Sequence, residues 1–374
     1  MKYLAVLGRQ PEISIAELES LYGGSWHQMP FSGRSGALAQ VLGPSKGILM
    51  LPVDIRRLGG VLKLAVEIEQ SLLEYLSGLP EGKITIGVSD YSKKASRKTA
   101  AMEALKLKRI LVRHGRSVRV VENKDAVLST ATSLHNGLSG KNDRKVELIK
   151  LNDEWYRVIG VQDIDAYAKR DQARPARDAK VGMLPPKLAQ ILINLCGPLK
   201  LGSVVLDPFC GTGVVLQEAL LMGYQAYGTD ISERMVEYSK KNLNYFKFNN
   251  FNLAVGDATN FQWVQPIDAV VCEGYLGKPF SRVPTEMELK EQEQECSGIV
   301  LGFMGNLAGQ IKKDTPVVIA IPAWLREDGE YERLDILDDV ANLGYNVDNK
   351  SREGLIYHRE GQIVARDIII LRKK

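Results

Sequence analysis

Three aspartates, each placed after an apolar strand-like run, are the residues of this sequence best arranged to do chemistry together. Asp207 follows SVVL, Asp230 follows QAYGT and Asp257 follows NLAVG. One helical stretch separates the first run from the second, and another separates the second from the third. This alternation predicts parallel strands whose carboxyl ends meet at one edge of a sheet. One aspartate at a strand end is more often a helix N-cap. Three on successive strands indicate a ligand site.

The turn after Asp207 narrows the choice of ligand. Gly211-Thr212-Gly213 opens a helix there, so the backbone can approach a ligand closely and the helix offers free amides. A nicotinamide dinucleotide fingerprint would need a third glycine where Leu216 stands. Asp207 would also repel a phosphate. An acidic loop instead suits a cofactor that carries a cation and an ammonium group, and S-adenosylmethionine is such a molecule.

We therefore predict an S-adenosylmethionine site at these strand ends. Asp230 is placed to accept hydrogen bonds from both ribose hydroxyls, and Asp257 to accept one from the adenine amine. The predicted cofactor-binding residues are Asp207, Phe209, Cys210, Gly211, Thr212, Gly213, Asp230, Ile231, Asp257 and Ala258.

The run DAVVCEGYLGKPF at residues 268–280 is the candidate for the catalytic groups. Its strand-like part leads into Glu273 and a glycine-containing loop, where parallel-sheet enzymes place catalytic residues. Glu273 is a candidate hydrogen-bond acceptor for the reacting group, and Tyr275 a platform on which a base could stack. Two alternatives for Glu273 stay open: a structural pairing with Lys278 or Arg282, and a site that binds without catalysing.

A basic segment lies well before these residues. Tyr91 to Lys124 contains eleven Lys/Arg and two Glu, whereas the whole chain has a net charge of only +4. Such a local excess indicates a face for a polyanion, although a solvated helix face would have the same composition. The predicted RNA-binding residues are Lys93, Lys94, Arg97, Lys98, Lys108, Arg109 and Arg113.

The elements that must position these residues fall into segments that differ in composition and in their pattern of strands and helices. A chain of 374 residues suggests about two or three domains. We predict an amino-terminal domain over residues 1–60, an α+β domain over 61–165 and a polar, proline-containing linker over 166–182. Residues 183–374 alternate strands and helices and predict an α/β doubly wound sheet, completed by an antiparallel hairpin around Glu360-Gly361.

Three helices are expected in the first half, one of them within the basic segment. Another runs from Ser14 through Leu21, with Ser14 as N-cap and Glu17 closing a capping box. The third is expected over residues 60–76.

The remaining composition excludes several classes. No stretch approaches the roughly 18 apolar residues of a membrane helix, and the first residues are too short an apolar run for a signal peptide. We expect no membrane association and a cytoplasmic location. The four cysteines form no CxxC pair and the four histidines are scattered, so no metal site is expected and the thiols should be reduced.

Several motifs together carry a resemblance to a known family. DPFCGTG is similar to the first motif of class I RNA methyltransferases that modify exocyclic amines. MKYLAVLGRQPEISIAELESL resembles the amino-terminal domain of the THUMP-containing tRNA guanosine N2-methyltransferases of the guanosine-10 type. TATSLHNGLSG and KVELIKL resemble the THUMP domain, and IYHREGQIVARDIIIL the closing hairpin. Arg170-Asp171 with Arg174-Pro175, followed by MLPPKLAQILINL, is similar to the family's linker and first catalytic-domain helix.

The resemblance implies a ferredoxin-like domain over residues 1–60, a THUMP domain over 61–165 and methylation of a guanosine exocyclic amine in tRNA. It also implies that the amino-terminal domains hold the tRNA. The family uses an Asp/Asn-Pro-Pro-Tyr turn to accept the amine protons and stack the base. This chain has Cys272-Glu273-Gly274-Tyr275, so either Cys272 or Glu273 occupies the acceptor position. Ribosomal RNA or a DNA adenine as substrate, and a non-catalytic RNA-binding protein, are the alternatives.

Overall fold

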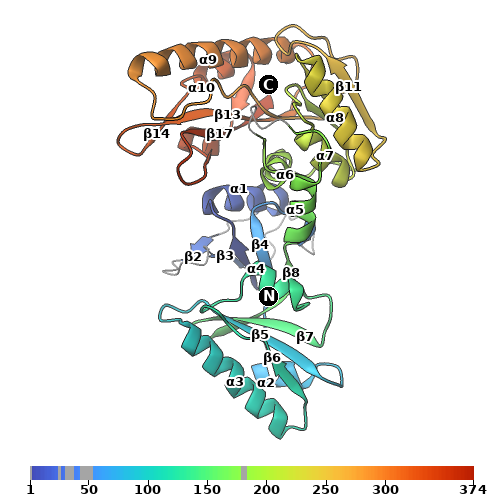
Figure 1. Ribbon diagram of the computed structural model, residues 1–374, viewed down its shortest axis with the longest axis vertical. Helices are drawn as coiled ribbons and strands as arrows, with labels where there is room; N and C mark the ends of the chain where they lie inside the picture. Colours follow the sequence, from blue (N-terminus) through green and yellow to red (C-terminus); the bar gives the residue numbers. More distant parts are fainter. Residues whose placement is uncertain (1, 24–26, 30–37, 43–53, 178–182) are drawn as a thin grey trace. The chain divides into compact units, whose positions relative to one another are not determined.

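The computed structural model describes residues 2–23, 27–29, 38–42, 54–177 and 183–374 (Figure 1). The chain forms two compact units, Met1–Tyr167 and Ala168–Lys374. Each unit has its own sheet and its own hydrophobic core.

The first unit is built on a mixed sheet of eight strands in the order β2-β3-β1-β4-β8-β7-β5-β6. Its strands are β1 (Lys2–Leu7), β2 (His27–Met29), β3 (Leu38–Leu42), β4 (Val61–Glu67), β5 (Ile84–Asp90), β6 (Val118–Val120), β7 (Lys145–Leu151) and β8 (Glu154–Val161). Its helices are α1 (Pro11–Tyr22), α2 (Leu72–Ser77), α3 (Arg97–Arg113), α4 (Thr130–His135) and the first turn of α5 (Ile164–Gln172).

The sheet of this unit is continuous across residue 60, where a domain boundary was predicted. β4 pairs with β1 on one side and with β8 on the other, both antiparallel. Strand pairing therefore joins residues 1–60 to residues 61–165 within one compact unit, although the composition of the two segments differs.

The basic helix is present as α3 and the first predicted helix lies within α1, but the start of α1 and the helix predicted over residues 60–76 differ from the structure. α1 begins at Pro11, so Ser14 lies inside the helix and donates to the Gln10 carbonyl instead of capping it. The buried Glu17 carboxylate accepts from the backbone N–H groups of Gly59 and Gly60, at 2.8 Å each. The helix predicted over residues 60–76 is instead strand β4 followed by the short helix α2.

The second unit is the predicted doubly wound sheet. Its strands are β9 (Val204–Asp207), β10 (Gln225–Asp230), β11 (Phe251–Val255), β12 (Ala269–Glu273), β13 (Pro316–Leu325), β14 (Tyr331–Arg333), β15 (Tyr345–Val347), β16 (Ile356–Tyr357) and β17 (Val364–Lys373). They lie in the order β11-β10-β9-β12-β13-β17-β15, and β14 pairs with β13 and β16 with β17. β9 to β13 are parallel, whereas β17 is antiparallel to β13, β15 and β16. The β16–β17 pair is the predicted terminal hairpin.

Helices cover both faces of this sheet (Figure 1). They are α6 (Pro186–Leu195), α7 (Val214–Leu221), α8 (Glu233–Tyr245), α9 (Glu286–Ala308), α10 (Leu337–Asn342) and α11 (Asn349–Glu353). α6 packs on β12 and β13, and α7 and α8 pack on β10.

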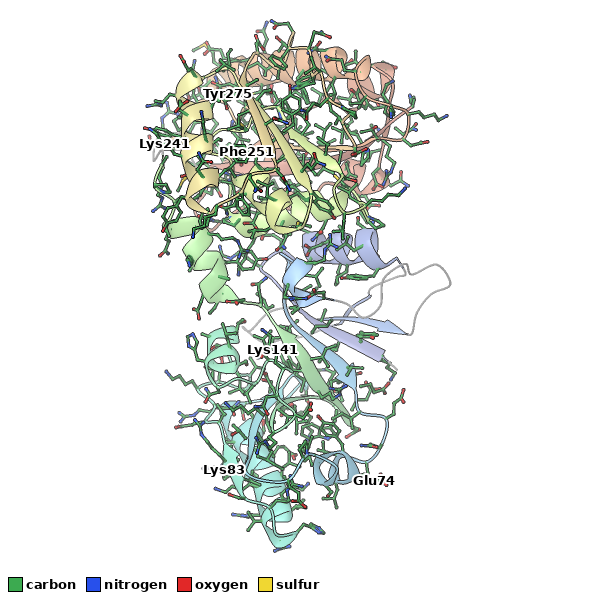
Figure 2. The ribbon with its side chains drawn as sticks, turned by 90° about the vertical axis from the view of Figure 1, so that its right-hand side faces the viewer. Glu74, Lys83, Lys141, Lys241, Phe251 and Tyr275 are labelled. Carbon is green, nitrogen blue, oxygen red and sulfur yellow. The ribbon has the colours of Figure 1, made fainter. Side chains whose placement is uncertain are left out.

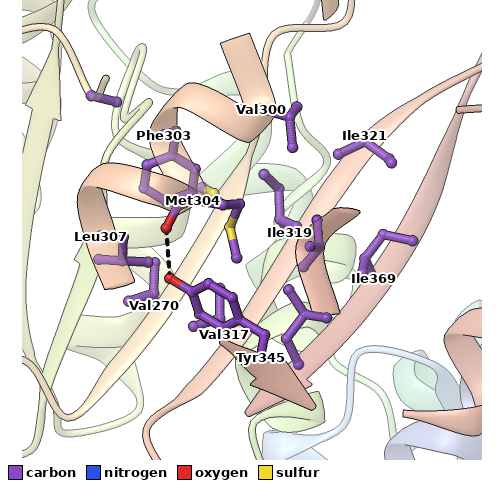
Figure 3. Packing of buried hydrophobic residues seen from close by; sticks show 14 of the residues in the cluster. Val270, Val300, Phe303, Met304, Leu307, Val317, Ile319, Ile321, Tyr345 and Ile369 are labelled. Carbon is purple, nitrogen blue, oxygen red and sulfur yellow. Dashed lines mark hydrogen bonds between the residues drawn. The ribbon is translucent and has the colours of Figure 1, made fainter. Parts of the chain in front are cut away.

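The main core of the second unit lies between α9 and the sheet (Figure 3). Phe303 and Met304 of α9 pack over Val317 and Ile319 of β13, and all four are almost fully buried. The hydroxyl of Tyr345 donates to the Met304 carbonyl at 2.9 Å. This packing fixes the strands whose carboxyl ends carry the candidate site.

Candidate functional site

Carboxylates gather at the carboxyl ends of three adjacent strands in the second unit. Asp207 ends β9, Asp230 ends β10 and Glu273 ends β12. β9 lies between the other two strands, at the point where the order of the sheet reverses. Ligands of open α/β sheets bind outside the strand ends at such a point.

The glycine turn after β9 is tied to the neighbouring strand. Asp230 accepts from the Gly211 N–H through Oδ2 and from the Ser232 N–H through Oδ1, at 2.9 Å each. Gly213, with φ +82°, has Ser239 Oγ 2.9 Å from the place a Cβ would take, so a larger residue would force α8 away. The turn is therefore held in a fixed, left-handed conformation against the start of α7.

Asp207 is the most deeply buried of the three carboxylates. Only 2% of it is exposed, and its Oδ1 accepts from the Phe209 N–H at 3.1 Å. Burial raises the pKa of Asp207 well above its ordinary range, and the negative charges of Asp230 and Glu273 raise it further. A cationic group bound here would offset this repulsion.

The end of β11 supplies the other side of the predicted cofactor site. Asp257 accepts through Oδ1 from the backbone N–H and the hydroxyl of Thr259, and these bonds lower the pKa of its carboxyl. Ala258 is buried, and its carbonyl accepts from Asn306 at 3.0 Å. Ile231, directly after Asp230, is 72% exposed although it is apolar, as a side chain that covers a ligand ring would be.

Three predicted cofactor-binding side chains turn out to be committed elsewhere. Cys210 packs with Leu216 beneath the helices and can offer a ligand only its backbone. Phe209 lies edge-on against Phe303, with the ring centroids 5.3 Å apart. Thr212 Oγ1 accepts from Arg174 at 3.2 Å.

The predicted linker supplies two arginines that join α7 and its loop. Arg170 donates to the buried Glu218 of α7 at 2.8 Å. Arg174 is itself only 3% exposed, and burial lowers the pKa of its guanidinium. These residues therefore pack as part of the second unit, and residues 178–182 of the predicted linker lie outside the described residues.

The candidate catalytic run, residues 268–280, places the carboxylate of Glu273 at the site. Cys272 is fully buried in the core beneath α9, so it cannot reach a substrate as the acceptor, and burial also raises the pKa of its thiol. Glu273, next along the strand, points to the opposite face. Its partner is Arg366 of β17, whose Nε donates to Glu273 Oε1. Neither Lys278 nor Arg282, the partners considered from the sequence, pairs with it.

Other contacts fix the loop after β12. The backbone N–H of Lys278 donates to Gln292 at 2.6 Å, and Arg282 pairs with Glu288 at 2.8 Å. Tyr275, labelled in Figure 2, is half-buried against the core under α9. Its hydroxyl donates to Glu295 Oε1 at 3.2 Å. The Tyr275 ring therefore lies in the loop that follows Glu273, at the same strand end.

The predicted RNA-binding residues lie in the first unit, on α3 and in the turn before it. Ala100, Ala104, Leu107 and Leu111 of α3 are buried against the sheet. Six of the seven predicted residues are exposed, and Lys108 is half-buried. Arg97 pairs with Glu122 at 3.1 Å.

Other site classes find little support in the residues that the structure describes. Among them, no group of His, Cys, Asp and Glu side chains could hold a metal ion. Nor is any helix in the described ranges long and apolar enough to cross a membrane. All four cysteines are free and buried.

Comparisons with known proteins find two family models and a solved structure that are similar to this chain. Residues 199–327 match the family model described as a methyltransferase domain, and residues 118–241 match one described as DNA methylase. A crystal structure of TrmN from Thermus thermophilus superimposes over 100% of both chains with a TM-score of 0.51, at 17% identity. The fold is thus that of a class I, Rossmann-like methyltransferase.

Two relatives are similar in sequence over part of the chain. The tRNA (guanine(10)-N2)-dimethyltransferase of Methanothermobacter thermautotrophicus is 41% identical over 29% of this chain and 32% of its own length. The probable tRNA (guanine(10)-N2)-dimethyltransferase of Methanothermococcus thermolithotrophicus is 31% identical over 36% of this chain and 78% of its own length. The chain therefore spans about a third of the first relative and most of the second.

The site residues fit the cofactor of such a domain, S-adenosylmethionine. A cation would offset the repulsion among Asp207, Asp230 and Glu273. The cofactor carries two cationic groups, an ammonium and a sulfonium. The exposed Ile231 beside Asp257 matches an adenine ring.

Proposed function

We propose that this chain, which belongs to the family of proteins named tRNA (guanine(10)-N2)-dimethyltransferases, transfers methyl groups from S-adenosylmethionine to N2 of guanosine 10 in tRNA. The observation that carries the proposal is the set of carboxylates at the ends of β9, β10 and β12 around the glycine turn. The names of the similar proteins support the choice of substrate.

The cofactor residues have distinct roles in this proposal. S-adenosylmethionine, when bound, supplies an activated methyl group. Asp207 binds its ammonium group, Asp230 its ribose hydroxyls, and Asp257 with Ala258 its adenine, which Ile231 covers. The backbone from Phe209 to Gly213 lines the remaining side.

Glu273 and Tyr275 are the proposed catalytic residues. The lone pair of a guanine exocyclic amine is delocalised into the ring, so the amine is a weak nucleophile. An ionised Glu273 can accept a hydrogen bond from that amine and hold its lone pair toward the methyl group. Tyr275 would stack on the base, which is worth about 1–3 kcal/mol.

The first unit would hold the RNA. We propose a ferredoxin-like part at residues 1–60 and a THUMP domain at 61–165, with the basic face of α3 on the phosphates. Its exposed cations favour this role, since phosphate contacts dominate RNA affinity. A tRNA substrate would place the protein in the cytoplasm.

DNA is the second candidate substrate, because residues 118–241 match the family model described as DNA methylase. The basic first unit is compatible with either nucleic acid. A direct comparison of incorporation into tRNA, ribosomal RNA and DNA decides between them.

Nucleoside mass spectrometry of tRNA from cells with and without the protein tests the proposal. Loss of an N2-methylated guanosine from the tRNA is expected. An unchanged tRNA profile, with a methylated base lost from ribosomal RNA or DNA instead, would contradict the assignment.

The Glu273→Gln variant tests the catalytic role. The amide keeps the shape but accepts weakly and cannot be ionised, so kcat should fall on the order of 100-fold. The dissociation constant of the cofactor, measured by calorimetry, should stay within about twofold. Full activity in this variant would remove Glu273 from the mechanism.

A further inference from the structure

Glu273 and Arg366 form a pair in which the arginine is buried and the carboxylate reaches the site. The side chain of Arg366 is 6% exposed, whereas that of Glu273 is 17% exposed. Within the described residues, Arg366 is the one group that donates to Glu273, and it uses Oε1. Oε2 therefore has no donor from the described part of the chain.

The two residues meet although a whole strand separates them. Glu273 of β12 pairs with Ala320 of β13, and Arg366 of β17 pairs with Pro322 of β13. Two strand spacings of about 4.8 Å lie between β12 and β17. The four side chains share one face, and the small Ala320 and Pro322 leave room for the guanidinium to pass over β13.

We infer that Arg366 is a positioning residue: it holds one oxygen of Glu273 and leaves the other for the target amine. This inference rests on the proposed function and deepens it. Arg366 itself touches neither the base nor the reacting atoms. Its guanidinium fixes the orientation of the Glu273 carboxylate.

The pairing also controls the charge of Glu273. Burial raises the pKa of this carboxyl, and Arg366 opposes that rise. Asp207 of β9 is a further charged group that interacts with it. α6, which packs on β12 and β13, contributes Lys187, whose pKa burial lowers. Removing Arg366 leaves burial unopposed, so Glu273 would become ionised only at higher pH.

The test is the pH profile of kcat/KM for tRNA methylation in Arg366→Gln. The acidic limb should move to higher pH, with activity about tenfold lower on that limb for each unit of displacement. Activity should recover as the pH rises. The limb should be absent in Glu273→Gln.

Arg333→Gln is the matched control. Arg333 pairs at 2.7 Å with the fully buried Asp367, the next residue of β17, on the opposite face of the sheet. This variant should lose stability but keep the wild-type pH profile. If it shifts the limb as much as Arg366→Gln does, or if neither shifts it, the positioning role is overturned.

Arg366→Lys carries the test if Arg366→Gln does not fold. A lysine keeps the charge but not the planar guanidinium, so the limb should stay near its wild-type position while kcat falls several-fold. A wild-type kcat in this variant would overturn the inference. A wild-type protein that binds the cofactor but methylates no nucleic acid would overturn the proposed function itself.

Discussion

Asp207 is the single residue on which cofactor binding should depend most. It is buried beneath the glycine turn, and its pKa is raised well above the ordinary value by burial and by Asp230 and Glu273. Asp207→Asn should weaken cofactor binding about 30-fold or more, since truncating one partner of a buried charge pair costs about 2–5 kcal/mol. Calorimetric titration measures this. Asp268→Asn, at the opposite end of β12, should leave binding unchanged.

The raised pKa of Asp207 also makes both binding and stability depend on pH. Cofactor affinity should rise as the pH rises through this pKa, and the rise should vanish in Asp207→Asn. In the cofactor-free protein the sign is reversed, because a raised pKa stabilises the fold at low pH and that stability is lost as the carboxyl ionises. Asp207→Asn should therefore melt higher than the wild type at neutral pH, and this gain should shrink toward pH 4.

The residues of the cofactor site could be predicted because each stands beside its own strand. Asp207, Asp230 and the glycine turn are local patterns, and adjacent parallel strands bring them together. Arg366 could not be predicted in this way, since it lies 93 residues after Glu273. The pair exists only because β17 inserts antiparallel beside β13. The inward orientation of Cys210 likewise depends on the packing of α7 and α8.

At the scale of elements, α3 is the helix whose surface should decide RNA affinity. Lys98, Arg109 and Arg113 lie on its outer side, away from the buried Ala104 and Leu111. Changing the three cations to glutamine should weaken tRNA binding and reduce the steepness of log K against log salt by about two to three, if each contacts one phosphate.

Filter binding at several salt concentrations measures that slope. Lys312→Gln with Lys313→Gln, two exposed lysines of the second unit, is the control for loss of charge alone. An equal loss of affinity in the control would mean that the effect comes from net charge and not from the face of α3.

The elements of the second unit were predicted better than those of the first. Its strands and helices alternate, and each strand is a short apolar run that ends at a turn. In the first unit, residues 61–67 are apolar enough for a helix but form β4, because pairing with both β1 and β8 outweighs helix propensity. Ser71 and Glu74 then form a capping box that begins α2 separately. These partners are distant in sequence, so the local pattern could not reveal them.

At the scale of the molecule, the second unit should need the arginines that precede its first predicted residue. Arg170 pairs with the buried Glu218, and Arg174 contacts Thr212 of the glycine turn. A fragment of residues 163–374 should fold and bind the cofactor. A fragment of residues 183–374 leaves the buried Glu218 without its arginine, and breaking a buried ion pair in this way costs roughly 3–5 kcal/mol.

Thermal melting and cofactor titration of the two fragments measure the difference. The longer fragment should melt higher and bind the cofactor more tightly. Equal melting temperatures and affinities would mean that residues 166–182 form a linker, as their composition alone indicates.

The central claim is tested most directly by methylation of a tRNA transcript that carries guanosine at position 10. The purified protein is incubated with labelled S-adenosylmethionine and this transcript, or with one that carries adenosine there, and the products are digested and separated. The account predicts label in N2-methylated guanosine from the first transcript alone. Cofactor binding without label in the guanosine, or label that persists in the adenosine transcript, would contradict it.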